Sequence, residues 1–280
     1  MDKKKKKERL DVLLVQKEYF PSREKAQRSI MAGVVFVDGQ RSDKAGNKID
    51  PDAEIEVRED ICPYVSRGGF KLEKSMELFP IDLNGKICAD IGASTGGFTD
   101  CMLQNGASKV YAMDVGYGQL AWKLRTDPRV VNMEKCNVRY LDPALVPDPI
   151  DFISVDVSFI SLKMIFPTAA KIIRQGGKMV CLVKPQFEAG REQMRGTGGI
   201  VRDPAIHAEA IQNVAAYAED NGFTPKGLTF SPVKGTKGNI EYLLYIEYNN
   251  ESENLDDIPE NSRYNETTVE SIVRQSHEDL

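Results

Sequence analysis

The stretch "DIGASTGGFTD", residues 90–100, directly follows the apolar run of residues 87–89 and contains three glycines and three small residues between two aspartates. Glycine lets a chain turn sharply, so a tight connection between a strand and a helix is one interpretation. Glycine also lets ligand atoms approach backbone N–H groups at the start of a helix. The loop alone leaves both interpretations open.

The next predicted strand favours the second interpretation, a loop that binds a ligand. It reads "KVYAMDVG" (109–116) and ends near Asp114, 22 residues after Gly92. An acid at this position can accept hydrogen bonds from both hydroxyls of a ribose, which indicates a nucleoside site. The glycine spacing differs from G-x-G-x-x-G and no P-loop lysine follows, so nicotinamide dinucleotides and ATP are disfavoured.

The surrounding sequence alternates strands and helices, which predicts a parallel sheet covered on both faces. The last two strands lack an intervening helix and are joined by "VKGTKGN", so they should form an antiparallel hairpin. Further strands are expected in "RVVNME", "DFISVDVSF" and "GKMVCLVKP". The expected helices lie at about 97–106, 117–126, 161–174 and 203–221. We therefore predict an α/β fold with a seven-strand sheet.

The pattern D-x-G-x-x-x-G-G resembles the S-adenosylmethionine loop of class I methyltransferases, whose seven-strand sheet also ends in an antiparallel hairpin. The resemblance implies S-adenosyl-L-methionine as the cofactor. Asn137, in "EKCNVRYL", lies where that family often contacts adenine, although an asparagine in a loop is also an ordinary turn residue. The implied cofactor-binding residues are Asp90, Gly92, Ala93, Ser94, Thr95, Gly96, Gly97, Phe98, Asp114 and Asn137.

Two charged residues follow predicted strands at the carboxyl edge of the sheet, where ligands of open α/β sheets bind. They are Asp156 in "SVDVSFISL" and Lys184 in "LVKPQFE". A lysine between a valine and a proline is poorly solvated, which favours its neutral form. Lys71 precedes the first strand of the sheet, and Glu241 interrupts an apolar strand. Taken singly, each could be an ordinary salt-bridged or surface residue.

Together, Lys71, Asp156, Lys184 and Glu241 resemble the Lys-Asp-Lys-Glu tetrad of 2′-O-ribose methyltransferases in order and in the elements that carry them. The resemblance implies that these four residues are catalytic. A ribose hydroxyl is a poor acid, so its methylation needs a base or a strongly polarising site, and a neutral lysine can serve as that base. The two carboxylates would orient the lysines.

Residues 8–60 read as a smaller α/β unit. Ser22 is a suitable N-cap, Ile30 and Met31 are expected to face inward, and Gly33 ends the second helix. Asp38 begins an Asp-Gly turn between strands. Basic residues on the two helices could form a solvated face or contact a phosphate backbone.

The order of residues in this unit resembles the RNA-binding domain named after small-subunit ribosomal protein four, with Asp38 where that pattern often has asparagine. The resemblance rests on Arg9-Leu10-Asp11, Ser22-Arg23, Ala26, Ile30, Gly33, Val35, Val37-Asp38-Gly39 and Ile55-Glu56-Val57. In that family the basic residues of the two helices contact structured RNA. The predicted RNA-binding residues are Arg9, Arg23, Lys25, Arg28 and, in a hinge-like Arg-Gly-Gly break, Arg67.

The remaining segments complete the predicted organisation. We predict a basic disordered arm at 1–7, a linker at 61–69, the methyltransferase domain at 70–248 and, at 249–280, an acidic tail that is flexible or weakly helical. The tail has nine acidic and two basic residues, which leaves 35 basic and 33 acidic residues elsewhere. This mildly basic remainder permits an anionic partner. The glycine-rich stretch 188–203 is either a loop near the substrate or a plain connector.

Across residues 8–248 the chain resembles the TlyA family, also called haemolysin A-like, in "YVSRGGFKL", "DIGASTGGFTD", "VDVSFISL", "LVKPQFE" and "VKGTKGNIEYL". The resemblance implies an FtsJ-like methyltransferase domain that methylates the 2′-oxygen of a cytidine in ribosomal RNA. We expect a monomeric, cytoplasmic enzyme that acts on ribosomal RNA or ribosomal subunits.

Two other functions stay open at this point. A non-catalytic ribosome assembly factor could bind RNA and cofactor without turnover. A membrane-lysing toxin is disfavoured, because the sequence has neither an apolar run of about 18 residues nor a secretion signal. Five scattered cysteines indicate reduced thiols. With only two histidines, no histidine-based metal site is expected.

Overall fold

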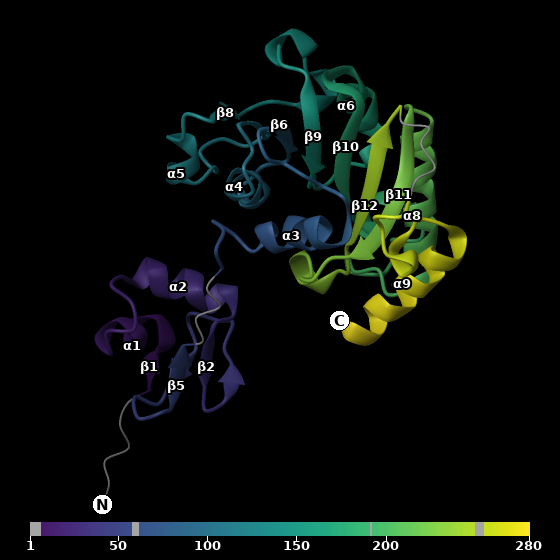
Figure 1. Ribbon diagram of the computed structural model, residues 1–280. Coiled ribbons are helices and arrows are strands. Elements are labelled where there is room, and N and C mark those ends of the chain that lie inside the picture. The colour runs from purple at the N-terminus through teal and green to yellow at the C-terminus, as the bar shows by residue number, and fades with distance from the viewer. Residues whose placement is uncertain (1–6, 58–61, 191, 250–254) are drawn as a thin grey trace, which may run out of the picture. The chain divides into compact units, whose positions relative to one another are not determined.

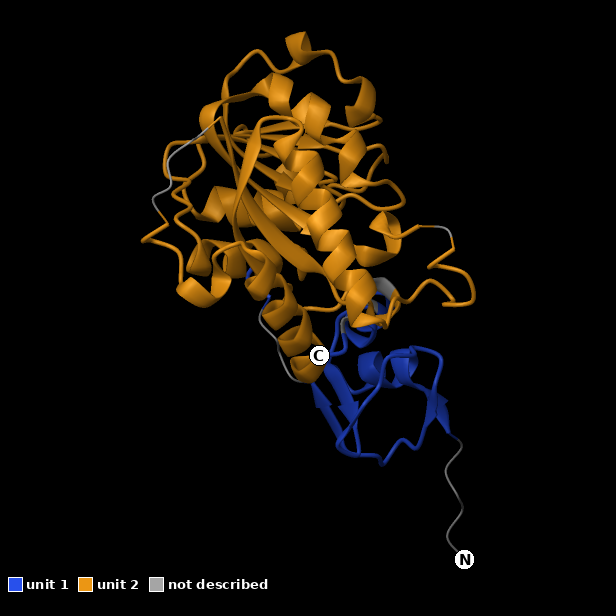
Figure 2. Ribbon diagram, turned by 90° about the vertical axis from the view of Figure 1, so that its right-hand side faces the viewer, with its two compact units in different colours: residues 1–63 blue, residues 64–280 orange. Residues whose placement is uncertain are grey.

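The computed structural model describes residues 7–57, 62–190, 192–249 and 255–280. The chain forms two compact units, Met1–Pro63 and Tyr64–Leu280 (Figure 2). The second unit thus begins inside the predicted linker, because Tyr64 is buried and its ring packs edge-on against Phe70. Apart from Lys7, the predicted N-terminal arm lies outside the described residues.

The first unit is built from short elements. Its strands form a three-stranded antiparallel sheet in the order β3-β2-β5 and a separate β1–β4 pair. A small core of leucine, isoleucine, valine and alanine side chains joins them to the two helices. The elements are β1 (Glu8–Arg9), α1 (Leu10–Gln16), α2 (Arg23–Ala32), β2 (Val35–Val37), β3 (Gln40–Arg41), β4 (Lys48–Ile49) and β5 (Ile55–Val57).

The local signals in this unit act as predicted, with one exception. The Ser22 hydroxyl accepts a hydrogen bond from the backbone N–H of Lys25 at 3.3 Å, which caps α2. Gly33 ends the helix at φ 77°, in the left-handed region that favours glycine. The prediction for Met31 is wrong: its side chain is 68% exposed, because the buried stripe of α2 runs through Ala26 and Ile30.

The second unit contains a seven-stranded sheet in the order β11-β12-β10-β9-β6-β7-β8 (Figure 1). β10, β9, β6, β7 and β8 are parallel, and β12 lies antiparallel between β10 and β11. The predicted architecture is therefore confirmed. The strands are β6 (Ile87–Ile91), β7 (Lys109–Met113), β8 (Val130–Met133), β9 (Ile150–Val155), β10 (Ile173–Val183), β11 (Phe223–Phe230) and β12 (Tyr242–Tyr248).

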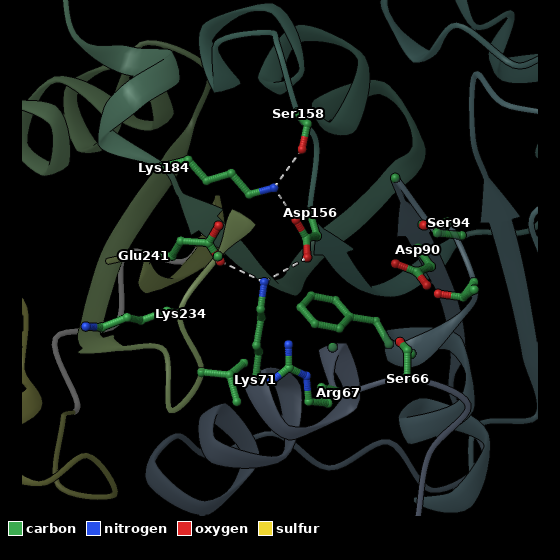
Figure 3. A pocket seen from close by; sticks show the side chains of 18 residues that line it. Ser66, Arg67, Lys71, Asp90, Ser94, Asp156, Ser158, Lys184, Lys234 and Glu241 are labelled. Atoms are coloured by element: carbon green, nitrogen blue, oxygen red, sulfur yellow. Dashed lines mark hydrogen bonds and ion pairs between the residues drawn. The ribbon is translucent and has the colours of Figure 1, made fainter. Parts of the chain in front are cut away.

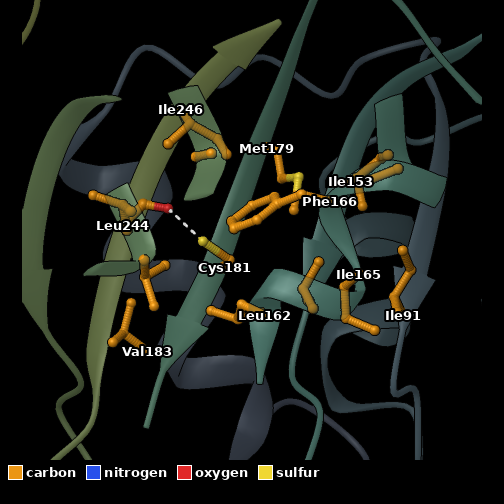
Figure 4. Close-up of a cluster of buried hydrophobic side chains, with 14 of the residues drawn as sticks. Ile91, Ile153, Leu162, Ile165, Phe166, Met179, Cys181, Val183, Leu244 and Ile246 are labelled. Carbon is orange, nitrogen blue, oxygen red and sulfur yellow. Dashed lines mark hydrogen bonds between the residues drawn. The ribbon is translucent and has the colours of Figure 1, made fainter. Parts of the chain in front are cut away.

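Helices cover both faces of this sheet. Successive side chains of a strand point to opposite faces, so one strand contacts helices on both sides. In β12, Leu244 and Ile246 lie in a core with Phe166 of α6 (Figure 4), and this core also contains residues of α8. Tyr245 faces the other way and stacks on Phe79 at the end of α3, with ring centroids 5.2 Å apart. The helices are α3 (Gly68–Leu78), α4 (Gly97–Gln104), α5 (Trp122–Arg125), α6 (Phe166–Ile172), α7 (Pro185–Glu188), α8 (Pro204–Glu219) and α9 (Glu266–Asp279).

The C-terminal segment corrects the prediction of a flexible tail, as far as residues 255–280 are described. Residues Glu266–Asp279 form α9, whose first turn is capped by the Asn265 side chain. Val269, Ile272 and Val273 are buried in the main core, and α9 packs against α8 and β11. Three apolar residues on one stripe of an otherwise polar helix are enough to dock it. Within the described ranges, no helix is both long and apolar enough to cross a membrane.

The topology gathers several chain segments at one edge of the sheet. Asp156 directly follows β9 and Lys184 directly follows β10, and these strands are parallel. β12 runs in the opposite direction, with Tyr242 paired to Val183, so Glu241 at its start lies at the same edge. The glycine loop after β6 lies there too, since β6 pairs in parallel with β9.

Candidate active site

The four predicted catalytic residues converge in a single cluster (Figure 3). Lys71 Nζ lies 2.7 Å from Glu241 Oε2 and 3.3 Å from Asp156 Oδ2. Lys184 Nζ lies 2.5 Å from Asp156 Oδ1 and donates a hydrogen bond to the Ser158 hydroxyl at 3.0 Å. Asp156 therefore bridges the two lysines, with one carboxylate oxygen for each.

The charged groups of the cluster are largely removed from solvent. Lys71, Lys184 and Glu241 are each less than 9% exposed. Burial alone disfavours the charged form of Lys71, but the carboxylates of Asp156 and Glu241 outweigh it and raise its pKa. Burial likewise disfavours ionised Asp156, yet the two lysines lower its pKa. At neutral pH, Lys71 is thus an ammonium and Asp156 a carboxylate.

A cavity of about 430 Å³ joins this cluster to the glycine loop. The loop side of the cavity is lined by Asp90, Gly92, Ala93, Ser94, Thr95, Gly97 and Phe98. Gly96, also predicted to bind cofactor, lines none of the described cavities that adjoin the cluster. It has φ 95°, and a Cβ there would lie 2.3 Å from Leu124, so its role is to let the loop pack.

A second cavity, of about 340 Å³, continues from the loop toward β7. Gly92 and Ser94 line both cavities, while Asp114 and Asn137 line the second. Asp114 is fixed by the backbone N–H groups of Ser94, at 2.8 Å, and Gly116, at 2.7 Å. The glycine loop, Asp114 after β7 and Asn137 after β8 thus line two adjoining cavities.

Asp90, near the end of β6, fixes the position of the glycine loop through hydrogen bonds. Its carboxylate accepts hydrogen bonds from the Thr99 N–H at 2.9 Å, the Thr99 hydroxyl at 2.6 Å and the Ser154 hydroxyl at 2.9 Å. Burial raises its pKa to about 6 in spite of these donors. The carboxylate therefore ties the start of α4 to β9 and fixes where the loop ends.

The predicted RNA-binding residues fall into two groups. In the first unit, Arg9 Nε and Arg23 Nη2 each lie 2.9 Å from the carboxylate of Asp11, whose side chain is fully buried. The hydrogen bond from Arg9, with those from its neighbours, lowers the pKa of Asp11. Lys25 is exposed, and the side chain of Arg28 lies outside the described part of the chain.

Arg67 does not belong with that group. It is exposed at the start of α3, in the second unit, and lines the first cavity together with Ser66 and Lys71. The structure therefore associates Arg67 with the charged cluster, which its sequence position in a predicted linker did not indicate.

Sequence reasoning also missed a third cavity, of about 220 Å³, next to Lys184 and Glu241. The rings of Phe159 and Phe187 lie next to each other at this cavity, with centroids 5.1 Å apart and planes tilted by 49°, and Phe159 is 91% exposed. Both aromatic residues stand within the matched segments "VDVSFISL" and "LVKPQFE", so their proximity to Asp156 and Lys184 was the available signal. Met194 and Gly199 of the glycine-rich stretch also line this cavity, so this stretch lies next to the charged cluster.

Comparison with known proteins agrees with this geometry. The FtsJ-like methyltransferase family matches residues 64–248, and the S4 domain family matches residues 8–55. Hemolysin A of Brachyspira hyodysenteriae is 47% identical over 239 residues, which cover 85% of this chain and 99% of that protein. The 16S/23S rRNA (cytidine-2'-O)-methyltransferase TlyA of Mycobacterium tuberculosis is 42% identical over 239 residues, covering 85% of this chain and 89% of that one.

A solved structure from Streptococcus thermophilus, provisionally described as a hemolysin, is similar over both units. It is 48% identical, has a TM-score of 0.76, and the match covers 98% of this chain and 97% of that chain. The chain thus belongs to the TlyA, or hemolysin A-like, family of rRNA methyltransferase homologues, in which an S4 domain precedes an FtsJ-like methyltransferase domain.

Proposed function

We propose that this chain methylates the 2′-oxygen of a cytidine ribose in ribosomal RNA, with S-adenosyl-L-methionine as the methyl donor. The observation that carries the proposal is the buried cluster of Lys71, Asp156, Lys184 and Glu241 beside the glycine-loop cavity. Two relatives are named for this reaction, the TlyA proteins of Mycobacterium tuberculosis and of Campylobacter jejuni. Ribosomal RNA as substrate implies action in the cytoplasm, and we propose a monomer.

The residues around the two larger cavities fit the cofactor. Each carboxylate oxygen of Asp114 accepts one backbone hydrogen bond and retains a lone pair for a ribose hydroxyl. Apolar side chains such as Val138 and Ile165, with Asn137, suit an adenine ring. Gly92 to Phe98, apart from Gly96, would border the methionine portion. When bound, the cofactor supplies an electrophilic methyl group, and the chain's own residues supply position and proton transfer.

Lys184 is the best candidate to accept the proton of the 2′-hydroxyl. Of the two lysines, Lys71 contacts two carboxylates, whereas Lys184 contacts one carboxylate and one hydroxyl. The Asp156 carboxylate, itself held by Lys71, would keep the Lys184 side chain in place while it loses and regains a proton. Positioning of the hydroxyl in line with the methyl group supplies much of the remaining acceleration.

The third cavity offers room for the base of the target nucleotide. It shares Ser158, Lys184 and Glu241 with the first cavity, so a ribose beside Lys184 would direct its base there. The rings of Phe159 and Phe187 are suited to stack on a base, as aromatic side chains do in RNA recognition.

The first unit supports binding of structured RNA. The buried carboxylate of Asp11 orients Arg9 and Arg23, whose side chains stay about half exposed at 49% and 54%. Guanidinium groups held in this way keep N–H donors for phosphate oxygens, and Lys25 and Arg28 lie on the same helix as Arg23. Arg67 could contact the RNA backbone near the cavity.

A methyl-transfer assay tests the proposal. Labelled S-adenosyl-L-methionine and the full-length protein are incubated with ribosomal subunits from cells that lack the gene, and the modified nucleotide is identified by mass spectrometry. We expect 2′-O-methylcytidine, and a rate about 10²- to 10⁴-fold lower for Lys184→Ala, the usual contribution of general acid–base catalysis. A protein that binds cofactor and subunits without transferring methyl groups would instead be an assembly factor.

A further inference from the structure

The proposed reaction makes no use of His207, a histidine in α8 that is only 1% exposed. Both of its ring nitrogens have partners. Nδ1 lies 2.7 Å from the Tyr242 hydroxyl, and Nε2 lies 3.1 Å from the backbone carbonyl oxygen of Val201. The imidazole therefore joins β12 to the chain segment that precedes α8.

These partners fix the tautomer. A carbonyl oxygen can only accept a hydrogen bond, so Nε2 carries the proton and donates it to Val201. In the neutral ring Nδ1 is then an acceptor for the Tyr242 hydroxyl, which also lies 2.9 Å from the Ser276 hydroxyl of α9. Burial lowers the pKa of His207 to about 4, so the ring is neutral near pH 7 and retains this arrangement.

Val201 lies near the end of the connector, which we define as residues 189–203 between α7 and α8, with residue 191 outside the described part. Met194 and Gly199 of the connector line the third cavity, beside Lys184 and Glu241. Gly196, Gly198 and Gly199 all have positive φ angles. Backbone hydrogen bonds fold residues 192–200 into successive turns, and side-chain hydrogen bonds tie these turns to the rest of the unit.

Gln193 of the connector donates a hydrogen bond to Glu209 of α8 at 2.7 Å, and two further side chains hold Gly199 and Val201 near its end. Asn239, two residues before Glu241, accepts a hydrogen bond from the Val201 N–H at 3.2 Å and donates one to the Gly199 carbonyl at 2.9 Å. His207 holds the Val201 carbonyl from α8. The same imidazole contacts Tyr242, which directly follows Glu241 and pairs with Val183, the residue before Lys184.

We infer that His207 is a positioning residue for the proposed methyl transfer. Through its hydrogen bond to Val201 it fixes the position of the connector, which forms one wall of the third cavity. Through its contact with Tyr242 it fixes that wall relative to β12, next to Glu241. The inference rests on the proposed function for its effect on catalysis. The anchoring of the connector itself can be tested without any methyl transfer.

Two substitutions separate the two hydrogen bonds of the ring. In His207→Gln, the amide nitrogen replaces Nε2 and can still donate to Val201. In His207→Asn, the amide oxygen replaces Nδ1 and can still accept a hydrogen bond from the Tyr242 hydroxyl. The shorter side chain cannot donate a hydrogen bond to the Val201 carbonyl. For His207→Asn we expect trypsin to cleave after the exposed Arg195 about fivefold faster, as the loss of one hydrogen bond implies. His207→Gln should resemble the wild type.

The same pair of variants tests the catalytic consequence. His207→Asn should raise the KM for ribosomal RNA about fivefold, with kcat and the Kd for the cofactor unchanged, because only the substrate wall is released. Unchanged cleavage at Arg195 in His207→Asn would overturn the inference, as would a loosened connector with an unchanged KM.

A measurement on the wild-type chain guards against a variant that fails to fold. Nitrogen-15 NMR of the imidazole distinguishes the two neutral tautomers, and we expect the form protonated at Nε2. The form protonated at Nδ1 would overturn the inference, since its Nε2 could not donate to Val201. If the wild-type chain transferred no methyl group, only the proposed function would be contradicted. The tautomer and the trypsin cleavage rates would still show whether His207 holds the connector.

Discussion

At the scale of single residues, the charged cluster is asymmetric, and the asymmetry has energetic consequences. Lys71 balances two buried carboxylates, whereas Lys184 shares one of them. Removing one partner of a buried ion pair leaves an uncompensated charge, which costs more than the pair itself contributes. Stability and catalysis should therefore depend on different lysines.

Lys71→Ala should lower the free energy of unfolding by about 3 kcal/mol, because it leaves Glu241 buried without a cation. Lys184→Ala should cost clearly less, since Asp156 keeps Lys71 as a partner. The double variant Lys71→Met, Glu241→Gln should recover at least half of the loss. Urea unfolding of the variants measures these differences. Equal losses for the two single variants would contradict this account of the cluster.

His207 predicts how stability responds to acid. Its folded-state pKa of about 4 lies below the ordinary value of 6.5, so the folded chain binds the proton less well than the unfolded chain. The stabilisation is complete above the ordinary value and is lost as the pH falls from about 6.5 towards 4. Between pH 7.5 and 5 the free energy of unfolding should fall by about 1 to 2 kcal/mol from this group. His207→Gln should lack that share of the decrease; an identical pH profile would contradict the assignment.

At the scale of the elements, the glycine loop illustrates why some backbone positions tolerate no side chain. Gly92 has φ 87°, and a Cβ there would lie 2.3 Å from the carbonyl oxygen of Asp156. Gly118 has a similar φ of 71°, but open space surrounds it. Substituting each of these two glycines therefore distinguishes the cost of a strained φ angle from the cost of a steric clash with the chain at Asp156.

Gly118→Ala should cost about 1 kcal/mol of stability, the lower end for a strained backbone position, and leave cofactor binding intact. Gly92→Ala should cost several-fold more and abolish cofactor binding, because the loop and the chain at Asp156 must move apart. Calorimetric titration with S-adenosyl-L-methionine and thermal unfolding check both variants. Retained binding in Gly92→Ala would show that the loop does not border the cofactor.

The elements themselves were largely predictable, since strands rich in apolar residues alternated with helical segments. The expected boundaries differ where a local residue changes the conformation. The expected helix at 161–174 begins as a 3-10 turn at Leu162–Met164, and α6 ends at Ile172 because Ile173 already pairs with Ile150 in the sheet. The expected helix at 117–126 is reduced to α5, since Gly118 takes a left-handed conformation.

At the scale of the whole molecule, contacts between distant segments limited what the sequence could predict. The four charged residues were found because they match a known order, not because any local pattern brings residues 71 and 241 together. The third cavity and the His207 network need the tertiary structure, since they join α8, β12 and the connector. Arg67 was assigned to RNA binding from its sequence position, and only the fold brings it beside the cluster.

The C-terminal segment is the clearest case. Nine acidic residues among its 32 suggested a solvated tail, but composition does not report the spacing of the few apolar residues. In α9, Val269, Ile272 and Val273 share one buried stripe, and the Ser276 hydroxyl lies 2.9 Å from that of Tyr242. The helix is thus part of the structure that supports β12, the strand that begins next to Glu241.

Ile272→Ala should therefore lower the free energy of unfolding by about 2 to 4 kcal/mol, as expected for a buried isoleucine. Gln275→Ala, one turn away on the exposed side of α9, should change it by less than about 0.5 kcal/mol. Ile272→Ala should affect the unfolding of the whole second unit, because Ile272 belongs to the same core as the sheet. If the segment were a solvated tail, the two variants would unfold at the same urea concentration.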